Sequence, residues 1–162
     1  MKITLTKEAL SHGLQTVQNV VGARSTLPIL GNVLLIAEKG KLELRATDLD
    51  VSISSSVEAQ TELEGMTTLP AKRLFGLVRE IPEGDLEIEV SNKEICTLSA
   101  GPAKYKLNGL AAEEFPPLPK FKESQRLSLP QERLREMLRK TAYAVSTDES
   151  RYQLIANKID MI

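Results

Sequence analysis

The stretch Thr67-Thr68-Leu69-Pro70-Ala71-Lys72-Arg73-Leu74-Phe75-Gly76-Leu77-Val78 decides the fold of this chain. It predicts a short alternating strand that ends on Leu69 and a helix that opens at Pro70, with Leu74 and Val78 one helical turn apart. The same step occurs twice more, with the apolar pair Leu10/Leu14 near the start of the chain and the pair Leu134/Leu138 late in it. Recurrence at a spacing of roughly sixty residues predicts duplicated supersecondary units; the alternative is a chance alignment of three short helix starts.

Composition places the chain among soluble globular proteins. Of 162 residues, 41% are hydrophobic and 27% charged, which suffices for one good core, or for one domain and part of another. The net charge of −1 favours no nucleic-acid partner by itself, so only a local basic patch could bind one. Cys96 is the only cysteine, which excludes an internal disulfide and suits a reducing cytosol. With no apolar run of membrane-spanning length and no signal-peptide pattern, we expect a cytoplasmic protein without membrane contact.

Periodicity predicts two copies of one unit, each made of a strand, a helix and three meandering strands. In the first unit we expect a helix over residues 7–21 and strands over residues 29–37, 42–46 and 51–54. In the second unit we expect a helix over residues 71–81 and strands over residues 86–90, 95–98 and 103–107. Two such units predict an α+β domain in which helices pack on antiparallel sheet.

A Pro-rich segment, Phe115-Pro116-Pro117-Leu118-Pro119, predicts a stiff, extended linker after this domain. We therefore expect one domain over residues 1–119, and the linker with the start of a second domain over residues 120–162. The third unit opens near Ser124 with a strand and a helix, but the meander that should follow is missing. Its helix lacks a sheet to cover, so this half unit should be poorly stabilised by itself.

Several short motifs in register resemble the N-terminal part of the bacterial DNA polymerase III β sliding clamp family. They are residues 25–32 (Ser-Thr-Leu-Pro-Ile-Leu-Gly-Asn), 46–50 (Ala-Thr-Asp-Leu-Asp), 69–73 (Leu-Pro-Ala-Lys-Arg), 108–117 and 150–152 (Ser-Arg-Tyr). The resemblance implies the DNA clamp fold, with three similar domains of two repeats each, in a subunit that closes head-to-tail with a second one around duplex DNA. After Leu154 the family continues with an Asn-Gly turn and further strands, which residues 155–162 do not follow. It therefore implies a truncated chain: a frameshift product, a gene remnant or a deliberately cut sequence.

Basic side chains on the predicted helices are the candidate DNA contacts. Lys72 and Arg79 fall opposite the apolar stripe of the second helix. On the third helix the corresponding residues are Arg135, Arg139 and Lys140. From spacing alone these are equally ordinary solvated faces, which two glutamates would compensate on the third helix.

The resemblance assigns these basic residues a role, because in the family such helices line the central hole and hold phosphates. Contacts of that kind are independent of sequence and weaken with salt. The resemblance also implies DNA contact for Arg24, in the loop after the first helix. It places His12 on the face that the family turns towards DNA.

No catalytic, metal or cofactor site is indicated. Asp48 and Asp50 could suggest hard-cation ligands, but two carboxylates without a third ligand favour a hairpin turn. His12 has no Cys or Ser partner motif, so it predicts a polar residue on a helix face. Cys96 lies within a predicted strand and favours a small core residue. A Gly-rich phosphate loop, a nucleophile elbow and zinc-ligand spacing are all missing from the sequence.

The last predicted strand of the first domain carries Tyr105 between Lys104 and Lys106. Lysines beside an aromatic residue are also typical of a protected sheet edge. The resemblance implies that this strand pairs with the third domain of a partner subunit, with Leu74 and Phe75 near the same junction. These five residues are the candidate subunit interface.

The leading hypothesis is a non-catalytic replication processivity factor that tethers the polymerase to duplex DNA, present as a truncated chain that does not close a ring. The resemblance implies a homodimeric ring, polymerase and clamp-loader partners, and a partner-binding cleft of which Leu154 alone remains. One alternative is a clamp remnant that at most binds a full-length clamp. A second alternative is an unrelated α+β enzyme whose site the motifs do not reveal.

Overall fold

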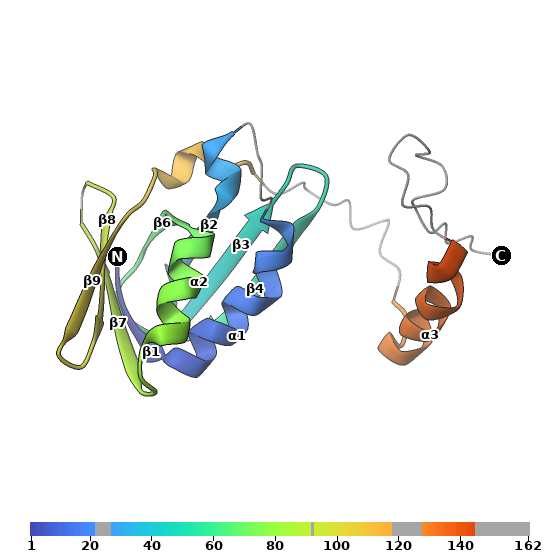
Figure 1. Cartoon of the computed structure of the whole chain (residues 1–162), viewed down its shortest axis with the longest axis horizontal. Helices are drawn as coiled ribbons and strands as arrows, with labels where there is room; N and C mark the ends of the chain where they lie inside the picture. Colours follow the sequence, from blue (N-terminus) through green and yellow to red (C-terminus); the bar gives the residue numbers. More distant parts are fainter. Residues whose placement is uncertain (22–26, 92, 118–127, 145–162) are drawn as a thin grey trace. The chain divides into compact units, whose positions relative to one another are not determined.

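The computed structural model describes residues 1–21, 27–91, 93–117 and 128–144. The chain divides into two compact units, Met1–Leu118 and Pro119–Ile162. The first unit has the predicted α+β fold, in which two helices and two antiparallel sheets enclose a core (Figure 1). Among the described residues, no helix is long and apolar enough to cross a membrane.

The first unit consists of two halves with a similar order of strands and helices, and the described part of the second unit contains two short helical segments. In the first half of the first unit they are β1 (Lys2–Thr6), α1 (Lys7–Val17), η1 (Gln18–Val20), η2 (Pro28–Gly31), β2 (Asn32–Glu38), β3 (Lys41–Thr47), β4 (Ser52–Glu58) and β5 (Gln60–Leu63). In its second half they are β6 (Gly65–Pro70), α2 (Ala71–Glu80), β7 (Asp85–Val90), β8 (Ile95–Ala100), β9 (Ala103–Asn108) and η3 (Ala112–Glu114). The second unit contains α3 (Gln131–Thr141) and η5 (Ala142–Ala144).

The two repeats are interlocked, because each contributes its first strand to the sheet of the other. The five-stranded sheet has the order β5-β1-β7-β8-β9, so β1 of the first repeat pairs with β7 of the second. The four-stranded sheet has the order β4-β3-β2-β6, so β6 of the second repeat pairs with β2 of the first. The strand-to-helix step is therefore the point at which the chain passes from one sheet to the helix layer.

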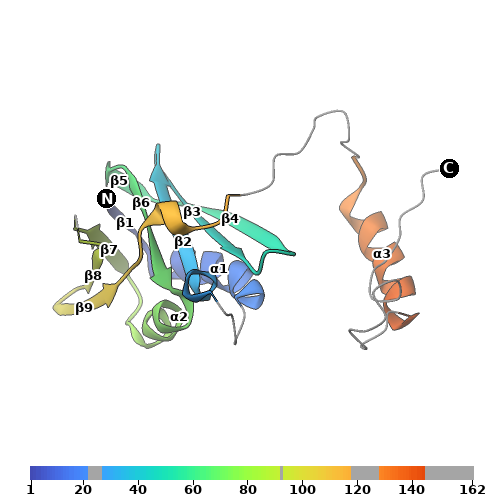
Figure 2. The same cartoon turned by 90° about the horizontal axis from the view of Figure 1, so that it is seen from above.

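The two helices lie side by side against the four-stranded sheet (Figures 1 and 2). The hydroxyl of Thr6 caps α1 by accepting a hydrogen bond from the backbone N–H of Ala9 at 3.1 Å. α1 packs mainly on β4, whereas α2 packs on β2 and β6. The first two apolar pairs that the repeat predicted, Leu10/Leu14 and Leu74/Val78, are buried in one core; burial of this kind is worth about 1.5–3 kcal/mol for each large apolar side chain.

Two local predictions were wrong, and one strand was not predicted. Residues 29–31 belong to the short 3₁₀ helix η2, which Pro28 opens, rather than to a strand. The edge strand β5 was not expected. Phe115 does not belong to an extended linker, because its side chain is buried in a small second cluster that includes Ile29 and Leu34.

A polar network fastens the segment after β9 to β6. Thr68 exchanges backbone hydrogen bonds of 3.2 Å with Leu110, and the N–H of Gly109 donates to the carbonyl of Glu94 at 2.8 Å. The side-chain amide of Asn32 donates to the Thr68 hydroxyl at 3.0 Å, and that hydroxyl donates to the Leu110 carbonyl at 2.9 Å. These bonds satisfy polar groups inside the fold and lead the chain from β9 towards η3.

The second unit shows a helix without a core. No residue of α3 is buried, and Met137 and Leu138 are about 40% exposed. The strand expected before it is not formed over residues 128–130. The described part of this unit therefore buries too little apolar surface to be stable by itself.

Candidate nucleic-acid interface

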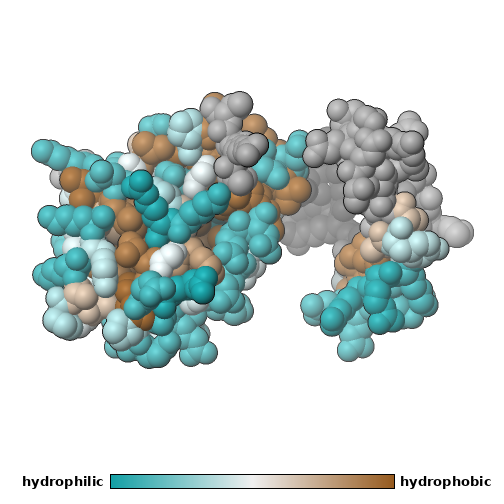
Figure 3. All heavy atoms as spheres, viewed as in Figure 1, coloured by the Kyte–Doolittle hydropathy of each residue, from teal (hydrophilic) through white to brown (hydrophobic). Residues whose placement is uncertain are grey.

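The outer, solvent-facing sides of α1 and α2 form one surface, which we call the helix surface. The start of α1 is tied to the segment after α2, because the N–H of Lys7 donates to the carbonyl of Gly84 at 2.9 Å. Lys7 Nζ also lies 3.1 Å from Glu83 Oε1. The two helices are thus held side by side and antiparallel, and hydrophilic side chains predominate over them in Figure 3.

α2 supplies the basic residues of the helix surface. Lys72 and Arg79 are exposed, and so is Arg73, which the sequence interpretation had not included. None of the three forms an ion pair with a described residue. Between Lys72 and Arg79 lies Gly76, where an added Cβ would meet no atom within 4 Å. The cations therefore surround a stretch of bare backbone that a ligand can approach closely.

α1 contributes a mainly polar side to the same surface. His12 is exposed there, on the helix face predicted for it. It lines a shallow groove of about 540 Å³ together with Lys7, Glu8, Gln15 and others. Because Glu8 and Glu83 both line this groove, the unpaired positive charge of the helix surface is concentrated on α2.

Two basic residues on the strands, Lys2 and Arg45, are paired within the chain, unlike those on α2. Lys2 Nζ lies 2.8 Å from Glu62 Oε2 and 3.4 Å from Glu87 Oε2. Arg45 Nε and Nη2 donate to the two carboxylate oxygens of Glu43 at 2.7 and 2.9 Å. The hydrogen bond to Glu62 raises the pKa of Lys2, and that to Glu43 raises the pKa of Arg45. The charges of Lys2 and Arg45 are therefore less available to a ligand than those of α2; on β9, Lys104 and Lys106 are exposed and form no ion pair with a described residue.

The basic residues of the second unit belong to α3. Arg135, Arg139 and Lys140 are all exposed. Lys140 Nζ lies 2.7 Å from Glu136 Oε1, one helical turn earlier, so its charge is partly compensated. Arg24 and Leu154 lie outside the described residues.

The described part of the chain does not group residues into a metal site. No group of three or more His, Cys, Asp or Glu residues there could hold a metal ion. Asp48 forms the predicted turn instead, because its Oδ1 accepts hydrogen bonds from the N–H groups of Asp50 at 3.1 Å and Val51 at 2.7 Å. Burial raises the pKa of the Cys96 thiol to about 11, which keeps it protonated and unreactive at neutral pH.

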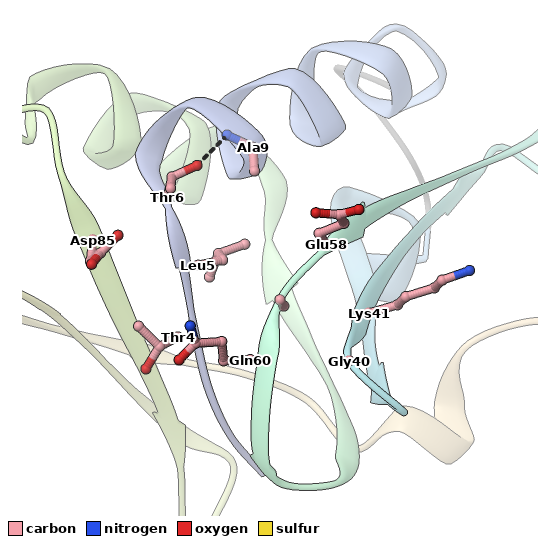
Figure 4. Close-up of a pocket in the computed structure, with 10 residues that line it drawn as sticks. Thr4, Leu5, Thr6, Ala9, Gly40, Lys41, Glu58, Gln60 and Asp85 are labelled. Atoms are coloured by element: carbon pink, nitrogen blue, oxygen red, sulfur yellow. Dashed lines mark hydrogen bonds between the residues drawn. The ribbon is translucent and has the colours of Figure 1, made fainter.

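A groove of about 500 Å³ opens between β1, β5 and the turn that joins β2 to β3 (Figure 4). Its polar lining includes Thr4, Thr6, Glu58 and Asp85, and it contains neither a histidine nor a cysteine. The hydroxyl of Thr6 is engaged as the cap of α1. The lining therefore contains neither a Ser–His nor a Cys–His pair of the kind used in nucleophilic catalysis.

Comparison with known proteins decides the family. A family model described as DNA polymerase III beta subunit, N-terminal domain, matches residues 1–119. The chain belongs to the β sliding clamp family. It is 36% identical over 154 residues to the beta sliding clamp of Chlamydia trachomatis serovar D, which covers 95% of this chain and 37% of that protein. It is 38% identical over 156 residues to the clamp of Caulobacter vibrioides, covering 95% of this chain and 42% of the relative.

Solved clamp structures share the fold. The Caulobacter crescentus pol III beta structure superposes with a TM-score of 0.88 at 38% identity, over 95% of this chain and 42% of that one. The Bacillus subtilis DNA polymerase sliding clamp gives a TM-score of 0.88 at 32% identity, over 94% and 42% of the two chains. This clamp chain therefore spans about two fifths of the length of the relatives it matches.

The predicted interface residues of this clamp chain are only partly at its surface. β9 is an edge strand, on which Lys104 and Lys106 are exposed and Tyr105 is half-buried. Phe75 is also half-buried, and it lines a pocket of about 360 Å³ with Lys72. Leu74 has no exposed surface, because it lies on the inner side of α2. Leu74 is therefore a core residue and cannot itself contact a partner.

Proposed function

We propose that the Met1–Leu118 unit serves as a DNA-facing wall of a sliding clamp, with the helix surface against the phosphates of duplex DNA. The observation that carries this proposal is the unpaired positive charge of Lys72, Arg73 and Arg79 around Gly76. Membership of the sliding clamp family supports it. Arg139 and Arg135 on α3, together with Arg24, would extend the same kind of contact.

Contacts of this kind make binding weak and insensitive to base sequence. Each phosphate that a cation neutralises contributes a slope of about −0.9 to the dependence of log K on log salt. Three contacts from α2 would therefore give a slope of roughly −2.7. A clamp keeps its DNA by encircling it, so a chain that does not close a ring would hold duplex DNA only through these contacts.

Charge reversal on α2 tests the proposal. In the double variant Lys72→Glu/Arg79→Glu, we expect duplex binding to fall to background, because two phosphate contacts become repulsive. The matched control is Lys39→Glu/Lys93→Glu, which makes the same charge change at two exposed turn residues outside the helix surface. Binding is measured by fluorescence anisotropy on a labelled duplex over a salt series, after circular dichroism has confirmed the fold of each variant.

Either of two binding results would contradict the proposal. One is a Lys72→Glu/Arg79→Glu variant that binds as well as the control variant. The other is binding by the unaltered chain that does not change with salt.

The chain would also take part in the wider activity of the sliding clamp family. As part of a clamp, the chain would act without catalysis in the cytoplasm, within a homodimeric ring that a clamp loader opens and a polymerase binds. A second candidate function is a clamp remnant that binds a full-length clamp through β9, which is an edge strand with two exposed lysines. Co-sedimentation with a full-length clamp would separate these two functions.

A further inference from the structure

A pocket of about 360 Å³ lies between the end of α1 and the start of α2. Two stretches far apart in the sequence line it: Gln18, Asn19 and Val21 after α1, and Ala71, Lys72 and Phe75 at the start of α2. Because the two helices are antiparallel, these stretches meet at the same end of the helix layer (Figure 1). The volume is at the lower end of the range for small-molecule sites, so the pocket suits one small molecule or one residue of a polymer.

The pocket is positively charged. Lys72 is the only charged residue of its lining, and this side chain forms no ion pair with a described residue. No side chain caps the start of α2, and the N-terminal end of a helix also attracts anions. The charges at the pocket therefore favour an anionic ligand over a basic one.

Phe75 gives the pocket an aromatic wall. Its side chain is half-buried, because it packs against the main core and also lines the pocket. The core contact holds the ring in place, which lowers the entropic cost of stacking a planar ligand on it. Val21 and Ala71 add apolar surface to the lining. Proteins commonly hold an unpaired base by stacking it on an aromatic side chain in this way.

Gln18 and Asn19 supply hydrogen-bonding groups to the same pocket. Gln18 is half-buried and Asn19 is exposed, and neither side chain forms a hydrogen bond with a described residue. An amide group both donates and accepts, and amide side chains are the ones that pair with the edge of adenine. The pocket thus combines a cation, an aromatic ring and two free amides, which match the phosphate, the face and the edge of a nucleotide.

We propose that this pocket binds one unpaired nucleotide, with the phosphate at Lys72, the base against Phe75 and the base edge at the amides of Gln18 and Asn19. A base inside duplex DNA is stacked and paired, so only a nucleotide of a single strand or a free nucleotide can enter. The link to DNA rests on the proposed function, because Lys72 also belongs to the helix surface. That surface would hold phosphates alone, whereas the pocket would hold a base as well.

Titration of the ¹⁵N-labelled chain with deoxyadenosine monophosphate tests the pocket by nuclear magnetic resonance. The side-chain amide signals of Gln18 and Asn19 and the backbone signals of Lys72 and Phe75 should shift together. 2-Deoxyribose 5-phosphate, which lacks the base, and deoxyadenosine, which lacks the phosphate, should each bind at least about fivefold more weakly. A single-stranded oligonucleotide of four deoxyadenosines identifies the source of the ligand. If it binds the same residues more tightly than the monophosphate, the ligand is a DNA strand; otherwise it is a free nucleotide.

Two variants separate the base contact from the phosphate contact. Phe75→Leu keeps an apolar side chain on the core and removes the ring, so deoxyadenosine monophosphate should lose its advantage over 2-deoxyribose 5-phosphate. Asn19→Ala changes an exposed residue and should weaken binding of the monophosphate about two- to tenfold. The matched control, Asn108→Ala, removes the same group from an exposed position on β9 and should leave this binding unchanged.

The proposal is overturned if 2-deoxyribose 5-phosphate binds as tightly as the monophosphate, because the pocket would then be a phosphate site only. It is equally overturned if the shifted signals belong to other residues, or if Asn19→Ala binds the monophosphate like Asn108→Ala. None of these measurements uses duplex DNA. They can therefore fail while the charge-reversal test still confirms duplex binding, and the reverse is also possible.

Discussion

Two glycines of the first unit should respond to the same substitution with opposite signs. At Gly109 an added Cβ would fall on the backbone carbonyl oxygen of Thr68, and would lie 3.1 Å from both the Glu94 carbonyl oxygen and the Thr67 hydroxyl oxygen. At Gly76 an added Cβ would meet nothing within 4 Å. Gly109→Ala should therefore destabilise the fold, and Gly76→Ala should stabilise it.

The magnitude at Gly109 follows from what must move. Relief of the overlap displaces β6 from the segment after β9, at about 1–3 kcal/mol for overpacking. The displacement also weakens the paired bonds between Thr68 and Leu110, each worth about 1 kcal/mol. We expect Gly109→Ala to lower the free energy of unfolding by about 2–4 kcal/mol, and Gly76→Ala, in an exposed helix interior, to raise it by about 0.5–1 kcal/mol.

Urea unfolding followed by circular dichroism measures both effects. If the dependence of the free energy of unfolding on urea concentration stays the same, Gly109→Ala should lower the urea concentration at the midpoint of unfolding, and Gly76→Ala should raise it. An unchanged midpoint for Gly109→Ala would refute the reasoning, because it would mean that the network accommodates a methyl group without cost. If Gly76→Ala destabilised the fold, some contact at that position would have to exist that the open geometry does not contain.

Three further predictions concern the cap, the thiol and the second unit. Thr6→Ala should lower the free energy of unfolding by about 1 kcal/mol in urea melts, while Thr16→Ala, which removes only a hydrogen bond within α1, should change it little. Because burial raises the pKa of Cys96 to about 11, the folded state keeps a proton that the unfolded state loses. Relative to Cys96→Ala, stability should therefore fall by roughly 2 kcal/mol as the pH rises from about 9 to about 11. Limited proteolysis should cleave α3 before any element of Met1–Leu118, since no residue of α3 is buried.

The helices could be predicted from sequence because their signals are local. The spacing of Leu74 and Val78 alone places both inside α2, and the structure buries both completely. β5 gave no such signal, because Gln60-Thr61-Glu62-Leu63 is polar and becomes a strand only by pairing with β1. The apolar run from Ile29 was taken for a strand, since an apolar run by itself does not separate strand from helix.

The site could be predicted only in part. The helical face of Lys72 and Arg79 follows from periodicity, but whether a cation is already paired depends on other strands and cannot be read from spacing. Arg73 was missed because it lies towards the side of α2 rather than opposite the apolar stripe. Leu74 was assigned to the subunit interface by resemblance, although its own spacing indicates the core. The complete burial of the Leu74 side chain agrees with the assignment from spacing, which places it in the core.

The exchange of first strands between repeats accounts for the lack of buried residues in α3 within the described part of its unit. In the first unit, β6 of the second repeat completes the four-stranded sheet on which α1 and α2 lie. β1 of the first repeat completes the five-stranded sheet. Residues 128–144 contain α3 and η5 but no strand that could take part in such an exchange. The sequence of α3 favours a helix locally, with an i,i+4 pair between Glu136 and Lys140 worth about 0.3–0.5 kcal/mol. Local preference of that size shapes the helix, but only an exchanged strand would give its apolar stripe a sheet to cover.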